Sequence, residues 1–168
     1  MPGNLGIGDV AGIAVGHDLV YLPEFRRSLQ PRFIDRAFTA QEVAGAAQAF
    51  DAGAYFGARW AAKEAAYKAL CDLSAAHGLP LDGLACFRDY EVARRPKSPV
   101  PALVLHGQPR RRMEVLAVDP IGGVSLSLTG EHEYVAAFVA LFSWPVASGA
   151  TSIKIAEMAE LGQTVAHS

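Results

Sequence analysis

The residues that decide the fold are Ala58-Arg59-Trp60-Ala61-Ala62-Lys63-Glu64-Ala65-Ala66-Tyr67-Lys68-Ala69-Leu70. They belong to an alanine-rich stretch, residues 54–70, which contains one glycine and no proline and therefore predicts a long helix. At the 3.6-residue period, one face of this helix carries the large side chains Phe56, Trp60, Tyr67 and Leu70, with Lys63 between them. The pattern predicts a helix that packs within the core.

Shorter elements are expected on both sides of this helix. Before it, the pattern predicts a strand over residues 11–20 and helices over 24–29 and 40–50, with Pro31 ending the first helix. Thr39 and Glu42 have the spacing of a capping box at the start of the second helix. After it, we expect strands over 84–93, 102–105, 124–129 and 134–142, and helices over 108–118 and 152–159. The expected fold is α+β, with a small antiparallel sheet packed on a long helix.

Length and composition exclude several protein classes. The chain has 168 residues and a mass of 17.8 kDa, which suits one domain. Hydrophobic residues make up 51% and charged residues 19%, so a disordered chain is excluded. The net charge of −2 favours neither nucleic acid nor an anionic membrane as a partner. With two cysteines, no apolar run of about 18 residues and no basic N-terminal region, we expect a soluble, cytoplasmic protein without disulfides.

Glu64 and Lys68 form the first arrangement that could carry chemistry. They are four residues apart and so lie on one face of the long helix. Gly57 and Ala61 lie on the same stripe, and their small side chains would leave room for a large anionic ligand. The alternative is an exposed ion pair that only supports the helix, and spacing alone favours this alternative.

Asp18 follows Gly16-His17 in the first apolar strand and is the second arrangement of interest. A carboxylate at a strand end suits Mg²⁺, because hard cations prefer oxygen ligands. A turn or capping aspartate is the alternative. His17 is a possible ligand or base, although a lone histidine is more often a hydrogen-bonded structural residue.

A third arrangement lies on the strand Val124-Ser125-Leu126-Ser127-Leu128-Thr129. Alternation places Ser125, Ser127 and Thr129 on one face, where their hydroxyls could bind phosphate oxygens. The alternative is the polar side of a half-buried strand, which the alternation alone favours. The run of arginines at 110–112 is expected to form a solvated helix face.

Together these segments resemble the holo-acyl-carrier-protein synthases, the short type of 4′-phosphopantetheinyl transferase. The resemblance spans residues 12–142 and is closest to actinobacterial-type members. It rests on Gly16-His17-Asp18 and the following residues to Phe25, on Trp60-Ala61-Ala62-Lys63-Glu64-Ala65, and on Val124-Ser125-Leu126-Ser127. We accordingly expect one transferase-like domain over residues 1–142 and a C-terminal extension of unknown role over 143–168.

The resemblance implies transfer of 4′-phosphopantetheine from coenzyme A to a serine of an acyl carrier protein or carrier domain, with Mg²⁺ as cofactor and release of 3′,5′-ADP. It implies that Asp18 and Glu64 bind the metal and that Lys68 contacts the phosphates. Asp9, in Gly6-Ile7-Gly8-Asp9, is a less favoured alternative to Asp18 as a metal ligand. It also assigns coenzyme A contacts to Arg59, Lys63, Lys68 and Ser127.

The resemblance further implies a homotrimer with active sites between subunits. Because carrier proteins are acidic, we expect them to dock on a cluster of basic residues on the first two helical segments. The candidates are Arg26, Arg27, Arg32 and Arg36.

One departure from the family pattern concerns Leu128, which stands where the family usually has a histidine near the phosphates. His132 and His17 are the available substitutes. Because of this departure we keep two other functions open. The first is a weakened family member that acts as a coenzyme A- or carrier-binding module. The second is a purely structural homo-oligomer in which the Lys-Glu helix serves only as scaffold.

Overall fold

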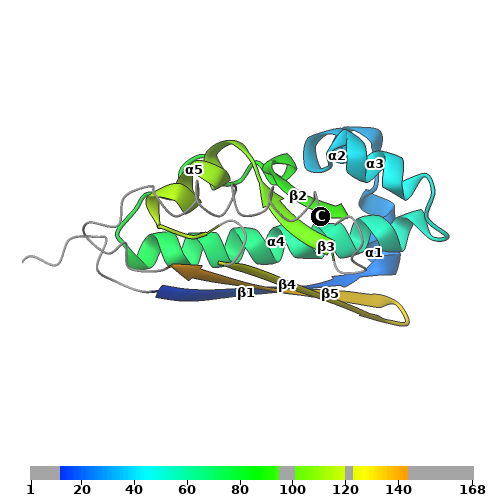
Figure 1. Cartoon of the computed structure of the whole chain (residues 1–168). Helices are drawn as coiled ribbons and strands as arrows, with labels where there is room; N and C mark the ends of the chain where they lie inside the picture. Colours follow the sequence, from blue (N-terminus) through cyan, green and yellow to red (C-terminus); the bar gives the residue numbers. More distant parts are fainter. Residues whose placement is uncertain (1–11, 95–100, 120–122, 144–168) are drawn as a thin grey trace, which may run out of the picture.

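The structure is a computed structural model that describes residues 12–94, 101–119 and 123–143. It has the predicted α+β architecture (Figure 1). In chain order the elements are β1 (Gly12–Tyr21), α1 (Leu22–Ser28), α2 (Pro31–Ala37), α3 (Ala40–Ala46), α4 (Ala52–Ala76), the short 3₁₀ helix η2 (Phe87–Asp89), β2 (Tyr90–Arg94), β3 (Pro101–Leu105), α5 (Gly107–Val115), β4 (Val124–Glu131) and β5 (Tyr134–Ser143).

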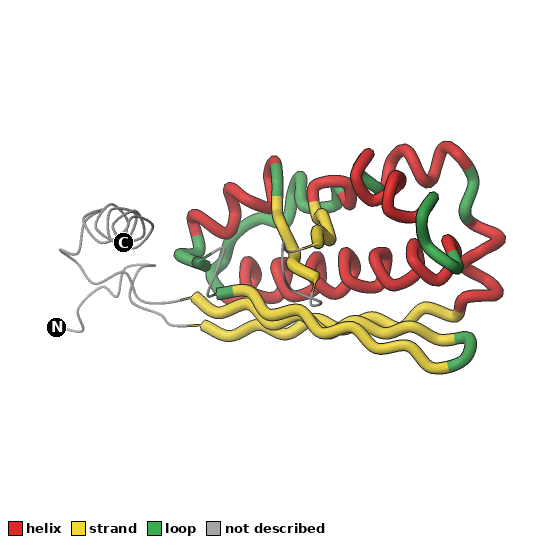
Figure 2. The backbone as a smooth tube through the Cα atoms, turned by 45° about the vertical axis from the view of Figure 1, so that its right-hand side comes forward, coloured by secondary structure: helices red, strands yellow, loops and turns green. Residues whose placement is uncertain are grey.

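The long helix α4 lies between two layers. A three-stranded antiparallel sheet in the order β1-β5-β4 covers one side of α4 (Figure 1). The other side carries the antiparallel pair β2-β3 together with the shorter helices (Figure 2). Because α4 is enclosed from both sides, its alanine-rich and aromatic faces are both needed for the core.

The contact between α4 and the sheet depends on small residues. A Cβ atom at Gly16 would lie 1.8 Å from the carbonyl oxygen of Ala65, so only glycine allows β1 to approach the helix backbone this closely. The helix residues that face the sheet include alanines with no exposed surface, such as Ala61 and Ala65. This close packing sets the position of Asp18, which lies on the same face of β1 as Gly16.

The expectation that Gly57 and Ala61 leave room for a ligand is wrong. Ala61 is fully buried, and a Cβ atom at Gly57 would lie 2.6 Å from Cδ2 of Leu22. Residues of the neighbouring layer fill the space beside these small side chains. The spacing of residues along one helix does not reveal this packing.

Several element boundaries differ from the sequence-based predictions. α1 ends before Pro31, as predicted, but Pro31 also begins α2, a helix that was not predicted, because proline is favourable in the first turn of a helix. α3 ends at Ala46, while α4 continues to Ala76. Only the second half of the strand predicted over 84–93 is extended, as η2 precedes β2. The helix predicted over 152–159 lies outside the described residues.

The capping box at the start of α3 is confirmed. The Thr39 hydroxyl accepts a hydrogen bond from the backbone N–H of Glu42, and the Glu42 carboxylate accepts one from the backbone N–H of Thr39. Within the described ranges, the structure contains no helix with both the length and the apolar character that crossing a membrane requires.

Candidate functional site

Asp18, Glu64 and Lys68 meet where β1 crosses α4. The ammonium of Lys68 lies 2.6 Å from Oδ1 of Asp18 and 3.7 Å from Oε2 of Glu64. It also donates a hydrogen bond of 3.3 Å to the carbonyl oxygen of His17. Strand and helix thus bring Asp18 next to Glu64 and Lys68, which lie one turn apart on α4, and we call these three side chains the acidic cluster.

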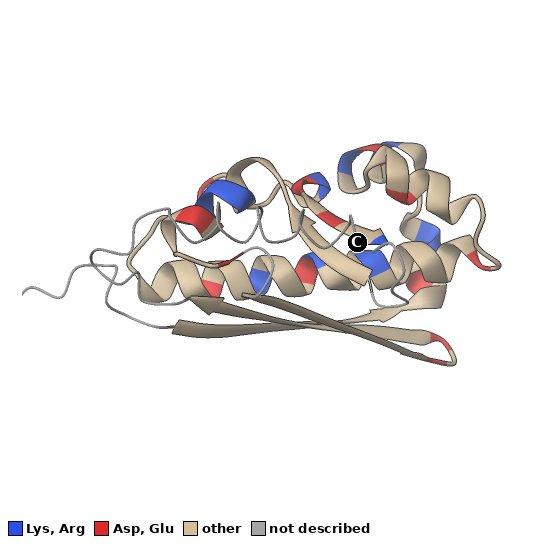
Figure 3. Cartoon of the chain, viewed as in Figure 1, with Lys and Arg blue, Asp and Glu red and all other residues tan. Residues whose placement is uncertain are grey.

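Two carboxylates in the acidic cluster share a single ammonium. Partial burial raises the pKa of Glu64, the nearby charge of Asp18 raises it further, and Lys68 only partly offsets both effects. The excess negative charge at this point is therefore not balanced by protein groups in contact with it. Figure 3 shows that acidic and basic residues alternate along the middle of α4.

The acidic cluster fits a hard divalent cation. Its two carboxylates offer oxygen donors, and their negative charge, which Lys68 balances only in part, is what such a cation would neutralise. No group of three or more His, Cys, Asp or Glu side chains suitable for a metal occurs among the described residues. Mg²⁺ suits two carboxylates, because it usually completes its shell with waters and substrate phosphates.

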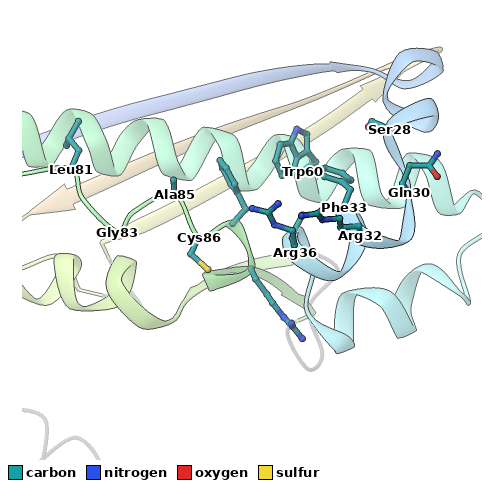
Figure 4. Close-up of a pocket in the computed structure, with 13 residues that line it drawn as sticks. Ser28, Gln30, Arg32, Phe33, Arg36, Trp60, Leu81, Gly83, Ala85 and Cys86 are labelled. Atoms are coloured by element: carbon teal, nitrogen blue, oxygen red, sulfur yellow. The ribbon is translucent and has the colours of Figure 1, made fainter.

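A large cavity opens on the other side of α4, between α2 and the loop that leads into η2. Its volume is about 1100 Å³. Trp60 and Phe33 lie together at one end, and Cys86 lies on the loop wall (Figure 4). Arg32, Arg36 and Arg88 also line it. Trp60 and Glu64 are one turn apart on α4, so this arginine-rimmed cavity begins close to the acidic cluster.

The sequence also matches known proteins. Residues 14–139 match the profile of the 4′-phosphopantetheinyl transferase superfamily. The chain belongs to this superfamily.

Individual relatives refine this assignment. The holo-[acyl-carrier-protein] synthase of Rhodopirellula baltica is 34% identical over 136 residues, which cover 79% of this chain and 98% of the relative. The mitochondrial holo-[acyl-carrier-protein] synthase of Eremothecium gossypii is 33% identical and covers 83% of this chain and 84% of the relative.

A solved ACPS–CoA complex of Chronobacterium ammoniagenes superposes with a TM-score of 0.65 at 27% identity, over 79% of this chain and 98% of that chain. The predicted family, fold class and enzyme type are confirmed.

In this transferase Lys63 is a buried structural residue. Its ammonium has no exposed surface, lies 2.9 Å from Oε2 of Glu42, and donates hydrogen bonds to the carbonyl oxygens of Phe87 and Tyr90. The Glu42 carboxylate in turn accepts hydrogen bonds from the backbone N–H groups of Thr39 and Val92. All three ammonium protons therefore have protein partners. The expected coenzyme A contact of Lys63 does not agree with this arrangement.

Arg59 is also separated from the acidic cluster. Its guanidinium lies over the ring of Tyr55, 3.2 Å from the ring centroid, and donates a hydrogen bond to the Tyr55 carbonyl oxygen. Burial lowers the pKa of Arg59, although the Tyr55 and Glu42 charges oppose this shift. Arg59 is five residues from Glu64, so the two side chains leave α4 in different directions.

Ser127 lies on the opposite face of the sheet from Asp18. In the register, Ser127 pairs with Phe138, which pairs with His17, and all three side chains are exposed on the face away from α4. The alternation of serines on β4 was predicted correctly as one shared face. Within one chain, this face lies on the side of the sheet away from the acidic cluster.

Leu128, in contrast, shares a row and a face with Asp18. Asp18 pairs with Ala137 on β5, and Ala137 pairs with Leu128 on β4. The two positions are two strand spacings apart, about 10 Å. Neither proposed substitute takes the place of a histidine here. The side chain of His17 is on the other face, and His132 lies in the β4–β5 turn, where its Nδ1 is 2.7 Å from Oε1 of Glu131.

Arg32 and Arg36 were predicted as docking residues, but the cavity that they line was not predicted. Trp60 was placed on the core face of the long helix, and Cys86 and Arg88 were placed in the strand predicted over 84–93. The available signal was the cluster of Arg32 and Arg36 around Phe33, which only becomes one helix face once Pro31 is recognised as the start of α2.

Proposed function

We propose that this transferase moves 4′-phosphopantetheine from coenzyme A to a serine of an acyl carrier protein or carrier domain, depends on Mg²⁺, and releases 3′,5′-ADP. The observation that carries this proposal is the convergence of Asp18, Glu64 and Lys68 at one point of the α4–β1 contact. In the reaction a bond forms between the serine oxygen and the β-phosphorus of coenzyme A, and the bond from that phosphorus to the bridging oxygen of 3′,5′-ADP breaks.

Asp18 and Glu64 would hold the cation through their carboxylate oxygens. A bound Mg²⁺ supplies neutralisation of the charge that develops on the diphosphate. Lys68 is the cation of the chain that lies beside these carboxylates, and its side chain is long and half-exposed. It can therefore donate to a phosphate oxygen and add to the positive charge around the leaving group.

Docking of the carrier is proposed at the arginine-rimmed cavity. Carrier proteins present acidic recognition surfaces, and Arg32, Arg36 and Arg88 give the cavity rim the opposite charge. The aromatic side chains of Trp60 and Phe33 offer apolar contact area between these charges. Arg26 is less available, because its guanidinium lies 2.5 Å from the carboxylate of Asp51.

Self-association into a homotrimer is part of the proposal. The sheet face away from α4 exposes large apolar side chains: Ile13 is 70% exposed, Leu19 64% and Phe138 48%. Large apolar side chains exposed together on one face usually mark an interaction site. Ser127 and His17 lie on the same face, so a contact of Ser127 with coenzyme A belongs to a site formed between copies.

A coenzyme A- or carrier-binding module that turns over slowly is the second candidate, and Leu128 favours it. A leucine in the row of Asp18 provides neither a charge nor a hydrogen bond toward the phosphates. Cytoplasmic localisation and the division into residues 1–142 and 143–168 also remain predictions.

The test is incubation of an apo carrier protein with coenzyme A, Mg²⁺ and this protein, followed by mass spectrometry of the carrier. A mass gain of one phosphopantetheine arm that requires Mg²⁺ supports the transferase. Binding of coenzyme A without this gain supports the binding module. Binding of neither coenzyme A nor carrier contradicts both and leaves the structural homo-oligomer.

A further inference from the structure

Lys68 occupies the point at which the two carboxylates of the acidic cluster converge. Its ammonium has three acceptors, namely Oδ1 of Asp18, the carbonyl oxygen of His17 and, at a longer distance, Oε2 of Glu64. The side chain of Asp18 is only 13% exposed, whereas that of Lys68 is 48% exposed. The carboxylate is thus fixed by the fold, while the lysine reaches it from a solvated position.

We propose that Lys68 is the internal counter-ion of the metal-free site, so that its contact with Asp18 and the binding of a divalent cation exclude one another. The inference rests on the proposed function, because the cation and the diphosphate belong to that function. It goes beyond it by assigning to Lys68 a second role, which is exercised before the substrate binds.

The physical argument is a balance of charge. With Lys68 in place, two carboxylates are partly neutralised by one ammonium. A divalent cation that binds the same oxygens must break the 2.6 Å contact and is repelled by the ammonium until that group moves away. Because the lysine side chain is half-exposed, it can leave without disturbing the core.

A displaced ammonium needs a new partner. A diphosphate that binds beside the acidic cluster supplies anionic oxygens, so the cost of displacing Lys68 from Asp18 is lowest when coenzyme A is present. The protein would then bind the cation and coenzyme A cooperatively, and the free protein would bind the cation weakly.

This arrangement gives Lys68→Met opposite effects in two states. In the free protein, loss of the ammonium removes the competitor, and we expect Mn²⁺ to bind roughly tenfold more tightly. For coenzyme A in the presence of Mn²⁺, loss of a phosphate ligand should weaken binding by about tenfold or more. A lysine that served only to stabilise the fold would not change the two affinities in opposite directions.

The experiment is a titration of the full-length protein with Mn²⁺, in which free Mn²⁺ is measured by electron paramagnetic resonance at low ionic strength. Coenzyme A affinity is then measured by calorimetry at saturating Mn²⁺. Lys68→Gln serves as a second neutral variant, and circular dichroism checks that both are folded. Lys68→Arg keeps the charge and should bind Mn²⁺ as the wild type does.

Two further variants are controls. Arg110→Met removes an exposed charge whose partner is Glu114 on α5, and it should leave Mn²⁺ affinity unchanged. Asp18→Asn should weaken Mn²⁺ binding.

Equal Mn²⁺ affinities for wild type, Lys68→Met and Lys68→Gln would overturn the inference, and so would weaker binding by the two folded neutral variants. The carrier modification assay would still decide the proposed function in either case. If the wild type modified no carrier but the neutral variants bound Mn²⁺ more tightly, the role of Lys68 would stand and the transferase proposal would fail.

Discussion

At the scale of single residues, Glu64, the proposed metal ligand, carries a cost to the stability of the fold. Its pKa is raised mainly by burial and further by Asp18, so folding favours the protonated form. The stability that this group contributes is therefore fully present below its unfolded pKa and is lost as the pH rises through the raised folded pKa.

Glu64→Gln should accordingly be more stable than the metal-free wild type at pH 8, and the difference should shrink at pH 4. Urea unfolding in EDTA at the two pH values measures this difference in the free energy of unfolding.

Glu64→Gln should also lose Mg²⁺-dependent transfer, because a neutral amide is a poor ligand for a hard cation. Asp18→Asn should lose transfer likewise, whereas Asp9→Asn should be nearly silent. A wild-type transfer rate for Glu64→Gln at ordinary Mg²⁺ concentration would remove Glu64 from the metal site.

Leu128 allows a gain-of-function test. A charged hydrogen bond is worth about 1.5–3 kcal/mol, so a histidine restored in this row should raise kcat by roughly 10- to 150-fold. Steady-state transfer by Leu128→His tests this. His17→Ala and His132→Ala should change kcat little, because neither side chain lies on the face of Asp18. If Leu128→His had no effect while either alanine variant slowed turnover, that histidine would already supply the missing interaction.

At the scale of elements, the buried pair of Glu42 and Lys63 fixes α3, α4 and β2 to one another. Both side chains are enclosed, with 1% and 0% exposed surface. Lys63→Met would leave a buried carboxylate without its counter-ion and should lower the free energy of unfolding by about 3–5 kcal/mol. Glu42→Gln should be destabilising as well.

The double variant Lys63→Met, Glu42→Gln should lose less than the sum of the two single losses, because no unpaired charge remains. Denaturant unfolding of all four proteins gives the coupling energy. Purely additive losses would show that the two residues stabilise the fold independently.

The features that could be predicted from the sequence are those set by residues close together in the chain. α4, the capping box at Thr39 and the strands β4 and β5 depend on contiguous patterns and were predicted. The grouping of Asp18 with Glu64 and Lys68 came only from resemblance, since nothing local links a strand to a helix 46 residues later. The burial of Lys63 and the face of Ser127 depend on packing and register across elements, which no single segment encodes.

At the scale of the whole molecule, the apolar sheet face should control the oligomeric state. Leu19→Lys places a charge on this face and should shift the protein from trimer to monomer, because a desolvated unpaired charge opposes association. Light scattering after size-exclusion chromatography measures the mass. Val43→Lys, at a side chain that is also exposed but lies on α3, should leave the mass unchanged. A monomeric wild type would contradict the proposed trimer.

The arginine-rimmed cavity should determine recognition of the carrier. Arg32→Glu with Arg36→Glu reverses the charge of its rim and should raise the KM for the carrier more than the KM for coenzyme A. The salt dependence of the carrier KM should also become flatter. Arg110→Glu with Arg111→Glu, on α5, is the matched control. An equal rise in both KM values would argue against a surface specific for the carrier.

The two strand systems on either side of α4 also bear on how such a protein can diverge. Asp18 belongs to β1 in one system, while Phe87, in the cavity wall, precedes β2 in the other, and these two sheets share no strand. Among the described residues, one turn of α4 carries a residue of each site, Trp60 in the cavity wall and Glu64 in the acidic cluster. The strand pair and its loop can therefore change to suit a new carrier without altering the proposed cation site.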